Sequence, residues 1–296
     1  MSTRKKTIAC FGATGGCVGA ALVCALKEGH YCTARTYIAA HWQQLWLIAV
    51  AVVRTPEKLR SFLTNGHGIP PSAIDERLTI FQGDVKDSAA VSKALISPLD
   101  KEVLVDVILS GVGAYPTFQW SLRRPLPLTD PTICETAIRT IFTALSDLSS
   151  ADKPQSTNGK LVEKPLLIPI STAGCGRRRG IPLSIYLPYH YLLGSPLADK
   201  RRMEEVVLKD KGAHVRDFVI MRPPFLTDRE ARGDSVLRVG WEWGAERNDQ
   251  AVKEPGPEIG YYVSRKDIGA WIFQKVVVQG GWEGKCVYLT YWQSGG

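Results

Sequence analysis

Short apolar runs rich in β-branched residues alternate along the chain with stretches of helical periodicity. This alternation is typical of a parallel sheet whose strands are joined by crossover helices. It therefore predicts an α/β fold with a doubly wound parallel sheet. The expected strands cover residues 7–11, one segment within 30–53, and residues 78–81, 103–109, 166–170, 215–221 and 286–290. The expected helices cover residues 20–28, 56–63, 88–95, 131–148, 199–211 and 265–277.

Three segments rich in proline and glycine follow predicted strand ends, at residues 111–131, 174–196 and 223–260. Sheets of this kind bind ligands beyond the carboxyl ends of their strands. We therefore expect these segments to be loops that form the substrate side, together with small C-terminal elements. No internal repeat is evident, and residues 1–296 are expected to form a single domain.

Composition narrows the class of protein. Hydrophobic residues make up 45% of the chain and charged residues 22%, which is typical of a globular protein with a large core. The net charge is +8, but the lysines and arginines are spread along the chain, so nucleic-acid binding is not indicated. The seven cysteines form no CxxC pair and are expected to be reduced thiols. With no secretory signal, and with residues 39–53 too short and polar for a membrane helix, we expect a cytoplasmic protein.

A glycine-rich turn follows the first predicted strand and precedes a predicted helix, from Gly12 to Gly19. Glycines at such a turn let the backbone approach a pyrophosphate, and the helix N-terminus supplies N–H groups and the positive end of its dipole. The position of the turn therefore predicts a dinucleotide-binding sheet of Rossmann type. The residues expected to contact the cofactor here are Gly12, Thr14, Gly15, Gly16 and Cys17.

The residue after the second strand discriminates between NADH and NADPH. An acid there would bond the ribose 2′-hydroxyl, whereas an arginine can pair with a 2′-phosphate. The chain has Arg54, which favours NADPH; the alternative is a solvated surface arginine. Asp84 and Val85, after the third strand, are expected near the adenine, and Ser110 and Gly111, after the fourth, near the cofactor ribose.

The region around the second strand is about twenty residues longer than such folds require. Codons for Arg35-Thr36 and Ala51-Val52 can supply GT and AG splice boundaries around an in-frame segment, so residues 35–52 are either a retained intron or a genuine insertion. If they are translated, Leu47 to Val53 can itself serve as the second strand and leave Arg54 in place.

These motifs resemble the short-chain dehydrogenase/reductase superfamily, in its atypical branch. That branch contains NmrA-like, isoflavone-reductase-like and biliverdin reductase B/flavin reductase-like proteins. The resemblance covers most of the chain and concerns fold and cofactor more than substrate. It rests on residues 12–15, 53–59, 83–85, 170–174, 199–205 and 221–224.

The resemblance also implies roles for residues of the reaction site. The Tyr-x-x-x-Lys pair of many members is absent, because no tyrosine of the 186–191 region has a lysine four residues later. Lys200 resembles a lysine placed near nicotinamide in isoflavone-reductase-like enzymes, and Ser171 resembles the serine that orients substrate. Tyr186, Tyr189 and His190 are candidate proton donors or ordinary packing residues, with Tyr186 taken as the catalytic one. Arg222 and Pro223 are expected to present backbone to the carboxamide of nicotinamide.

Two functions remain open at this point. The first is an NADPH-dependent reductase that transfers hydride to a small carbonyl, alkene or flavin-like acceptor. The second is a non-catalytic dinucleotide sensor that passes redox state to a protein partner. The five histidines show no metal-ligand spacing, so no metal is expected. Arg177 to Arg179 would either attract an acidic substrate or form a solvated charge run.

Overall fold

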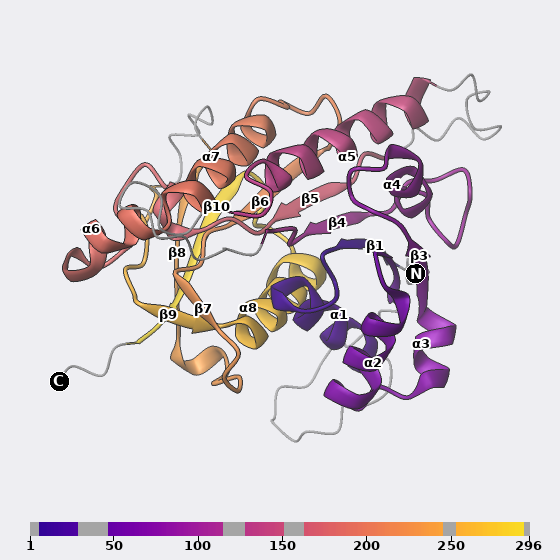
Figure 1. The fold of residues 1–296 in the computed structure, drawn as a ribbon, viewed down its shortest axis with the longest axis horizontal. Coiled ribbons are helices and arrows are strands. Elements are labelled where there is room, and N and C mark those ends of the chain that lie inside the picture. Colours follow the sequence, from indigo (N-terminus) through magenta and orange to yellow (C-terminus); the bar gives the residue numbers. More distant parts are fainter. Residues whose placement is uncertain (1–5, 29–46, 115–127, 151–162, 245–252, 293–296) are drawn as a thin grey trace.

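The computed structural model describes residues 6–28, 47–114, 128–150, 163–244 and 253–292. An eight-stranded sheet lies between two layers of helices, in the strand order β3-β2-β1-β4-β5-β6-β10-β8 (Figure 1). Every neighbouring pair in this sheet is parallel except β10 and β8. The predicted Rossmann-type α/β fold is therefore confirmed.

The bounds of the elements follow the chain. The sheet consists of β1 (Lys6–Phe11), β2 (Leu47–Val53), β3 (Leu78–Gln82), β4 (Val107–Ser110), β5 (Leu166–Pro169), β6 (Asp217–Met221), β8 (Leu237–Trp243) and β10 (Lys285–Tyr291), and a separate ribbon pairs β7 (Phe225–Thr227) with β9 (Tyr262–Ser264). The α-helices are α1 (Gly16–Glu28), α2 (Pro56–His67), α3 (Pro71–Arg77), α4 (Ser88–Leu95), α5 (Ile133–Ser150), α6 (Leu183–Leu192), α7 (Gly194–Leu208) and α8 (Arg265–Trp271). A π-helical segment, η3 (Ile272–Gln279), continues α8, and η1 (Ala173–Cys175) and η2 (Asp234–Val236) are short 3-10 turns.

Both faces of the sheet are covered, which explains why its strands are apolar without alternation. β1 contributes side chains to the core on each face of the sheet. Ile8 and Cys10 belong to the core on the face covered by α1, α2, α3 and α8. Ala9 and Phe11 belong to the core on the face covered by α4, α5 and α7. Figure 1 shows these two helical layers below and above the sheet. Ligands are therefore excluded from both faces, and the carboxyl edge of the sheet is left as the place for a site.

The second strand is built by residues that the sequence places in the candidate insertion. Leu47–Val53 forms β2 between β1 and β3, with Val52 opposite Phe11 and Val53 opposite Gln82. All of its residues except Ile48 are buried. Residues 47–52 of the 35–52 segment thus belong to a central strand and, apart from Ile48, to the core, and the rest of the segment lies outside the described residues. The retained intron stays a prediction.

The sequence led us to expect loops at residues 174–196 and 223–260. The structure shows that neither segment is a continuous loop. The first contains α6, and the second contains β7 and β8. α6 carries Pro188 inside it and is apolar nearly all round, so no helical periodicity marks it. In β8 the inward positions include Gly240 and Glu242, which hides the apolar alternation expected of a strand. The predicted strand 103–109 shortens to β4, and α3 was not expected.

Candidate active site

The glycine-rich turn exposes its backbone at the carboxyl end of β1. Gly12 has φ +82°, and a Cβ there would lie 2.9 Å from the carbonyl group of Gly111. Gly15 and Gly16 also have positive φ, of +155° and +63°, but a Cβ on either would point into open space. α1 begins at Gly16 with no acidic residue in its first turn. Positive φ, open space beside the turn and a helix N-terminus without an acidic residue are features typical of phosphate-binding turns.

Two cations lie near the first turn of α1. Burial raises the pKa of the Cys17 thiol to about 12. Among the neighbouring charges, Arg265 lowers this pKa most, Lys200 lowers it less, and Asp228 raises it. Cys17 is buried, and Thr14 is half-buried. The start of α1 is therefore an electropositive position that lacks an acid of its own.

Arg54 leaves the sheet beside this turn. Because Phe11 pairs with Val52, the residues after β1 and β2 emerge at the same edge. The Arg54 side chain is exposed and forms no ion pair with any residue that the structure describes, while its carbonyl accepts a hydrogen bond of 3.4 Å from Gln82 Nε2. This placement is compatible with a 2′-phosphate contact.

The residues predicted around the adenine and the ribose also lie at this edge. Asp84 is exposed, and its Oδ1 accepts a hydrogen bond of 2.9 Å from the Lys86 N–H, which forms a tight turn after β3. Val85 is partly buried and packs against the core on the face of the sheet that α4, α5 and α7 cover. Ser110 is buried, and a Cβ on Gly111 would lie 2.7 Å from Val18 of α1, so this loop approaches α1 closely.

Lys200 joins two loops at the same edge. Its Nζ donates hydrogen bonds to the carbonyl oxygen of Ile170, at 2.6 Å, and to that of Val112, at 3.2 Å. These two carbonyls follow β5 and β4, respectively. The neighbouring Asp199 is fully buried and accepts hydrogen bonds from the N–H groups of Cys134 and Glu135 at the start of α5. Lys200 therefore brings a positive charge to the predicted nicotinamide side and fixes two loops there.

Hydroxyl groups gather after β5. Ser171 is 4% exposed, and its Oγ has no hydrogen-bond partner among the residues that the structure describes. The next residue, Thr172, places its Oγ1 2.5 Å from the hydroxyl of Tyr189. Burial raises the pKa of Tyr189, and the Thr172 hydrogen bond opposes the rise. The Tyr189 side chain therefore stays protonated at neutral pH.

Tyr186, the tyrosine that the sequence suggests as catalytic, lies at a more exposed position than Tyr189. Tyr186 is 36% exposed, and its ring lies 4.4 Å from that of His190. Tyr189, three residues later in α6, is the tyrosine that the structure brings to Thr172. No spacing signal indicates this choice, because Leu193 stands where a Tyr-x-x-x-Lys lysine would be.

Comparisons with known proteins identify the family. No family model matches the chain. The chain is 32% identical to a protein named Reductase pytE from Aspergillus terreus, over 98% of this chain and 100% of that protein. It is also 32% identical to Oxidase pynE from Aspergillus niger, over 97% and 99% of the two chains. The chain belongs to the atypical short-chain dehydrogenase/reductase family. It is thus an oxidoreductase of the NAD(P)-binding Rossmann type.

A solved structure shares the fold of this reductase family member. ChuY, described as an anaerobillin reductase from Escherichia coli O157:H7, aligns with a TM-score of 0.57 at 16% identity, over 98% of this chain and 100% of that one. The alignment extends over nearly the whole chain, so the two proteins share the overall fold.

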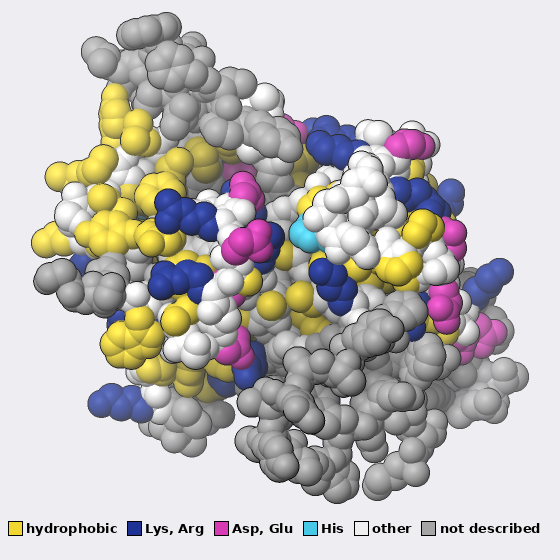
Figure 2. Space-filling model, turned by 90° about the horizontal axis from the view of Figure 1, so that it is seen from below, with side chains coloured by type: hydrophobic (Ala, Val, Ile, Leu, Met, Phe, Trp, Pro, Cys, Tyr) yellow, Lys and Arg dark blue, Asp and Glu magenta, His cyan; other side chains and the backbone are white. Residues whose placement is uncertain are grey.

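An apolar rim adjoins the hydroxyl groups of Thr172 and Tyr189. The ring of Tyr189 lies 5.0 Å from that of Phe225, which is 44% exposed. Figure 2 shows hydrophobic side chains gathered at the left of the face seen from below, the side on which α6, β7 and β9 lie in Figure 1. The exposed members of this rim are Leu183, Tyr186, Leu187, Tyr191, Leu192, Phe225, Tyr261 and Tyr262.

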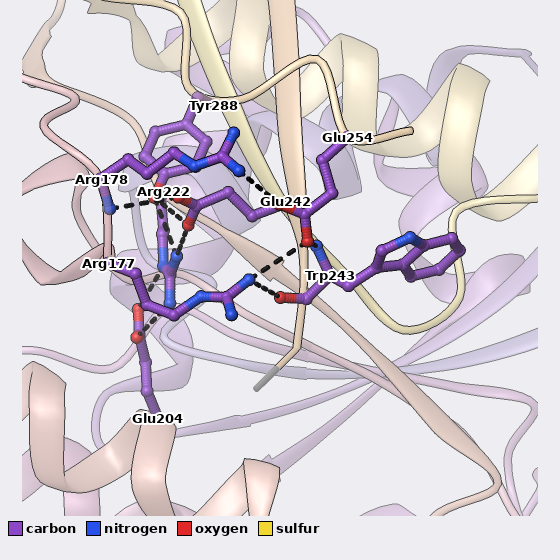
Figure 3. Close-up of polar contacts among 8 residues, drawn as sticks. All are labelled: Arg177, Arg178, Glu204, Arg222, Glu242, Trp243, Glu254 and Tyr288. Carbon is purple, nitrogen blue, oxygen red and sulfur yellow. Dashed lines mark hydrogen bonds and ion pairs between the residues drawn. The ribbon is translucent and has the colours of Figure 1, made fainter. Parts of the chain in front are cut away.

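Arg222 is the centre of a buried ionic network (Figure 3). Its Nε and Nη2 donate to the two carboxylate oxygens of Glu204 at 3.0 and 2.8 Å. Its Nη1 donates to Glu242 at 2.9 Å and to the Tyr288 hydroxyl at 2.8 Å. That Arg222 presents its backbone to the nicotinamide carboxamide stays a prediction, and its side chain binds the three partners just named. The main chain joins loops as well, since Pro223 accepts a hydrogen bond of 2.9 Å from the N–H of Ala173.

The arginine run is tied down around the same network. Arg177 donates to Glu254 and to the carbonyl of Trp243, both at 3.1 Å, and Arg178 pairs with Glu254 at 3.3 Å (Figure 3). Arg179 donates to the carbonyl of Ile181 at 3.0 Å. The contacts of Arg177 and Arg178 therefore connect the loop after β5 to Trp243 of β8 and to Glu254. Neither sequence-based interpretation, an acidic-substrate contact or a solvated charge run, included this role.

Other chemistries find no support in the parts of the chain that the structure describes. Within them, no group of histidine, cysteine and acidic side chains could hold a metal ion. No helix in the same ranges is long and apolar enough to cross a membrane. Six cysteines are described, and none of them forms a disulfide with another of the six: Cys10, Cys17, Cys24, Cys134, Cys175 and Cys286.

Proposed function

We propose that this protein is an NADPH-dependent reductase that transfers hydride to a small carbonyl, conjugated alkene or flavin-like acceptor. The observation that carries the proposal is the exposed glycine turn at the start of α1 with Arg54 beside it. The turn offers backbone N–H groups to a pyrophosphate, and Arg54 offers a guanidinium to a 2′-phosphate. The relative named Reductase pytE supports the same class of reaction.

The preference for NADPH rests on Arg54. A charge-assisted hydrogen bond to phosphate contributes roughly 1.5 to 3 kcal/mol, which corresponds to about a ten- to hundredfold preference. No ion pair within the described residues competes for the Arg54 guanidinium. NADH lacks the 2′-phosphate and would not gain this contact.

The side chains at the carboxyl edge have separate tasks in this proposal. The bound cofactor supplies the hydride. Lys200 keeps the loops after β4 and β5 together through their carbonyls. The buried hydroxyl of Ser171, next to the Cys175 thiol, orients the acceptor, and the protonated Thr172–Tyr189 pair supplies the proton that a reduced carbonyl needs.

A non-catalytic dinucleotide sensor is the second candidate. One observation favours it: Lys200 bonds two carbonyls, and the hydroxyl of Tyr189 bonds Thr172, so these two groups do not form the lysine-tyrosine pair of typical members. A sensor of this kind would bind both oxidation states of the cofactor and pass the difference to a protein partner.

Binding and turnover together test the proposal. We expect NADPH to bind at least tenfold more tightly than NADH in a fluorescence titration, and Arg54→Ala to abolish the difference. Arg60→Ala, at an exposed position of α2 paired with Asp75, is the matched control and should leave the preference unchanged. Equal affinity of the wild-type chain for both cofactors would overturn the NADPH assignment.

Turnover separates the two candidate functions. An enzyme consumes NADPH when carbonyl, alkene or flavin acceptors are added, whereas a sensor binds it without oxidation. Because the second relative is named Oxidase pynE, the assay should also run with NADP⁺ and the corresponding alcohols. Binding without turnover in both directions would favour the sensor.

A further inference from the structure

The helices α1 and α8 start side by side at the carboxyl edge of the sheet. α1 follows β1, and α8 leads through η3 into β10, which is parallel to β6. Both helices therefore run from the carboxyl edge toward the opposite edge, below the sheet (Figure 1). A Cβ on Gly269 would lie 2.5 Å from Ala20 Cβ, so the absence of a side chain there permits close contact. This contact is about one turn into each helix, which makes their first turns neighbours.

Arg265 is the first residue of α8 and lies near the phosphate-binding turn. Its Nη1 is 2.8 Å from Oδ1 of Asp228, and the two side chains are 31% and 88% exposed. Among the charged groups that act on the Cys17 thiol in the first turn of α1, Arg265 has the largest effect. Figure 2 shows Lys and Arg side chains next to Asp and Glu side chains near the middle of this face.

The ribbon beside Arg265 carries an unsatisfied polar group. Thr227 pairs in register with Ser264, the residue before Arg265. The Oγ1 of Thr227 is buried and has no hydrogen-bond partner among the residues that the structure describes. Buried hydroxyls in proteins are usually satisfied, so an unpaired one beside a cation at this edge indicates a place for a ligand oxygen.

We propose that Arg265 binds the pyrophosphate of the dinucleotide, exchanging Asp228 for a phosphate oxygen when the cofactor enters. This inference rests on the proposed function, because it requires a dinucleotide at the start of α1. Asp228 is a weak competitor, since ion pairs of exposed side chains contribute little. A guanidinium on phosphate forms shorter and stronger charge-assisted bonds.

The proposed role of Arg265 differs from that of Arg54. Arg54 would contact the 2′-phosphate, which only NADPH carries, whereas Arg265 would contact the pyrophosphate, which NADH and NADPH share. Removing Arg265 should therefore weaken both cofactors by the same factor. Binding of 2′-AMP, which has a 2′-phosphate and no pyrophosphate, should be unaffected.

The experiment titrates NADPH, NADH and 2′-AMP into four forms of the full chain: wild type, Arg265→Gln, Asp228→Asn and Lys266→Gln. Arg265→Gln should weaken NADPH and NADH by about ten- to a hundredfold and leave 2′-AMP unchanged. Asp228→Asn should tighten both dinucleotides by about two- to fivefold, because the competing anion is gone. Lys266→Gln is the matched control: Lys266 neighbours Arg265 and pairs with exposed Glu230, and its loss should change nothing.

The outcomes separate the inference from the proposed function. If the wild-type chain binds NADPH and Arg265→Gln binds it equally well, the role of Arg265 is overturned and the function stands. If Arg265→Gln loses 2′-AMP as strongly as NADPH, the effect is a general one on the fold or the field, and the inference also fails. If the wild-type chain binds no dinucleotide, the proposed function falls first. A melting curve of each variant, matched to wild type, shows that the variants are folded.

Discussion

The ammonium of Lys200 lies 2.6 Å from the carbonyl oxygen of Ile170, directly after β5, and 3.2 Å from that of Val112, after β4. Two of the three donors of a lysine are thus used to join neighbouring loops. The side chain that the sequence suggested as a nicotinamide-side residue has a structural task at the same position. Its removal should affect both the stability of the fold and the cofactor site.

We expect Lys200→Met to lower the free energy of unfolding by about 2 kcal/mol, because two carbonyls lose a charged donor. NADPH binding should weaken at the same time as the two loops separate. Urea unfolding and a fluorescence titration measure the two effects. Lys209→Met is the control, since Lys209 lies just beyond α7 and pairs with the exposed Glu205 of that helix. Equal behaviour of the two variants would contradict the linking role of Lys200.

Tyr189 and Tyr186 can be compared directly. Tyr189→Phe removes the hydroxyl that bonds Thr172 and should reduce kcat by about a hundredfold if this pair supplies the proton. Tyr186→Phe should leave kcat within twofold, because Tyr186 contacts His190 through its ring, which the substitution keeps. The reverse result, with kcat lost in Tyr186→Phe alone, would contradict the role of Tyr189 and identify Tyr186 as the proton donor.

Gly16→Ala should cost about 1 kcal/mol of stability, because its φ of +63° is unfavourable for a residue with a Cβ. It should also weaken NADPH by at least tenfold, because the methyl group would fill the open space at the turn. Gly68 provides the control: its φ is +66°, it also borders open space, and it ends α2. Gly68→Ala should show the same loss of stability without a change in affinity.

His190 provides a test of pH dependence. Burial lowers its pKa below the usual value of about 6.5, and the charge of Arg201 lowers it further. A depressed folded-state pKa means that the unfolded chain binds the proton first as the pH falls. The contribution of His190 to stability is therefore complete above pH 6.5 and is lost below it. An NMR titration of the imidazole should give a pKa under 6.5, and a value above 6.5 would refute the assignment.

The candidate insertion can be tested with a shortened chain in which residues 35–52 are replaced by leucine. If the segment is a retained intron, the shortened chain should melt at the same or a higher temperature and should bind NADPH. Transcripts that lack these codons should then be found. A shortened chain that fails to fold, together with transcripts that all retain the codons, would establish a genuine insertion.

The sequence predicts those parts of the fold that depend on local pattern. The parallel strands were recognisable because both faces of the sheet are buried, and the glycine turn because its positive φ values demand glycine. β8 was missed because Glu242 takes an inward position that pairs with Arg222. That contact joins Glu242 of β8 to a residue twenty positions away, directly after β6, and no local pattern encodes it.

The candidate site shows the same division. Gly12, Gly16 and Arg54 lie where strand order and a glycine turn place them, at one edge of the sheet. The Thr172–Tyr189 bond depends on how α6 folds back over the end of β5, and α6 has no periodicity that predicts it. The partners of Lys200 are main-chain carbonyls, which every residue has, so no residue type marks them in advance.

The Arg222 network has a consequence for how this chain can diversify. One guanidinium joins α7, β8 and β10, and the backbone N–H of Arg178 in the loop after β5 donates to Glu242, which Arg222 also contacts. Replacing one member alone would strand a buried charge, which is strongly destabilising. The buried side chains of the network can therefore be replaced only together, whereas the loop contributes a backbone N–H group that does not depend on the side chain of Arg178. Laboratory recombination that replaces Glu204, Arg222 or Glu242 alone should yield mostly insoluble protein, whereas joint replacement of Glu204, Arg222, Glu242 and Tyr288 by the matching set of a donor protein should restore folding.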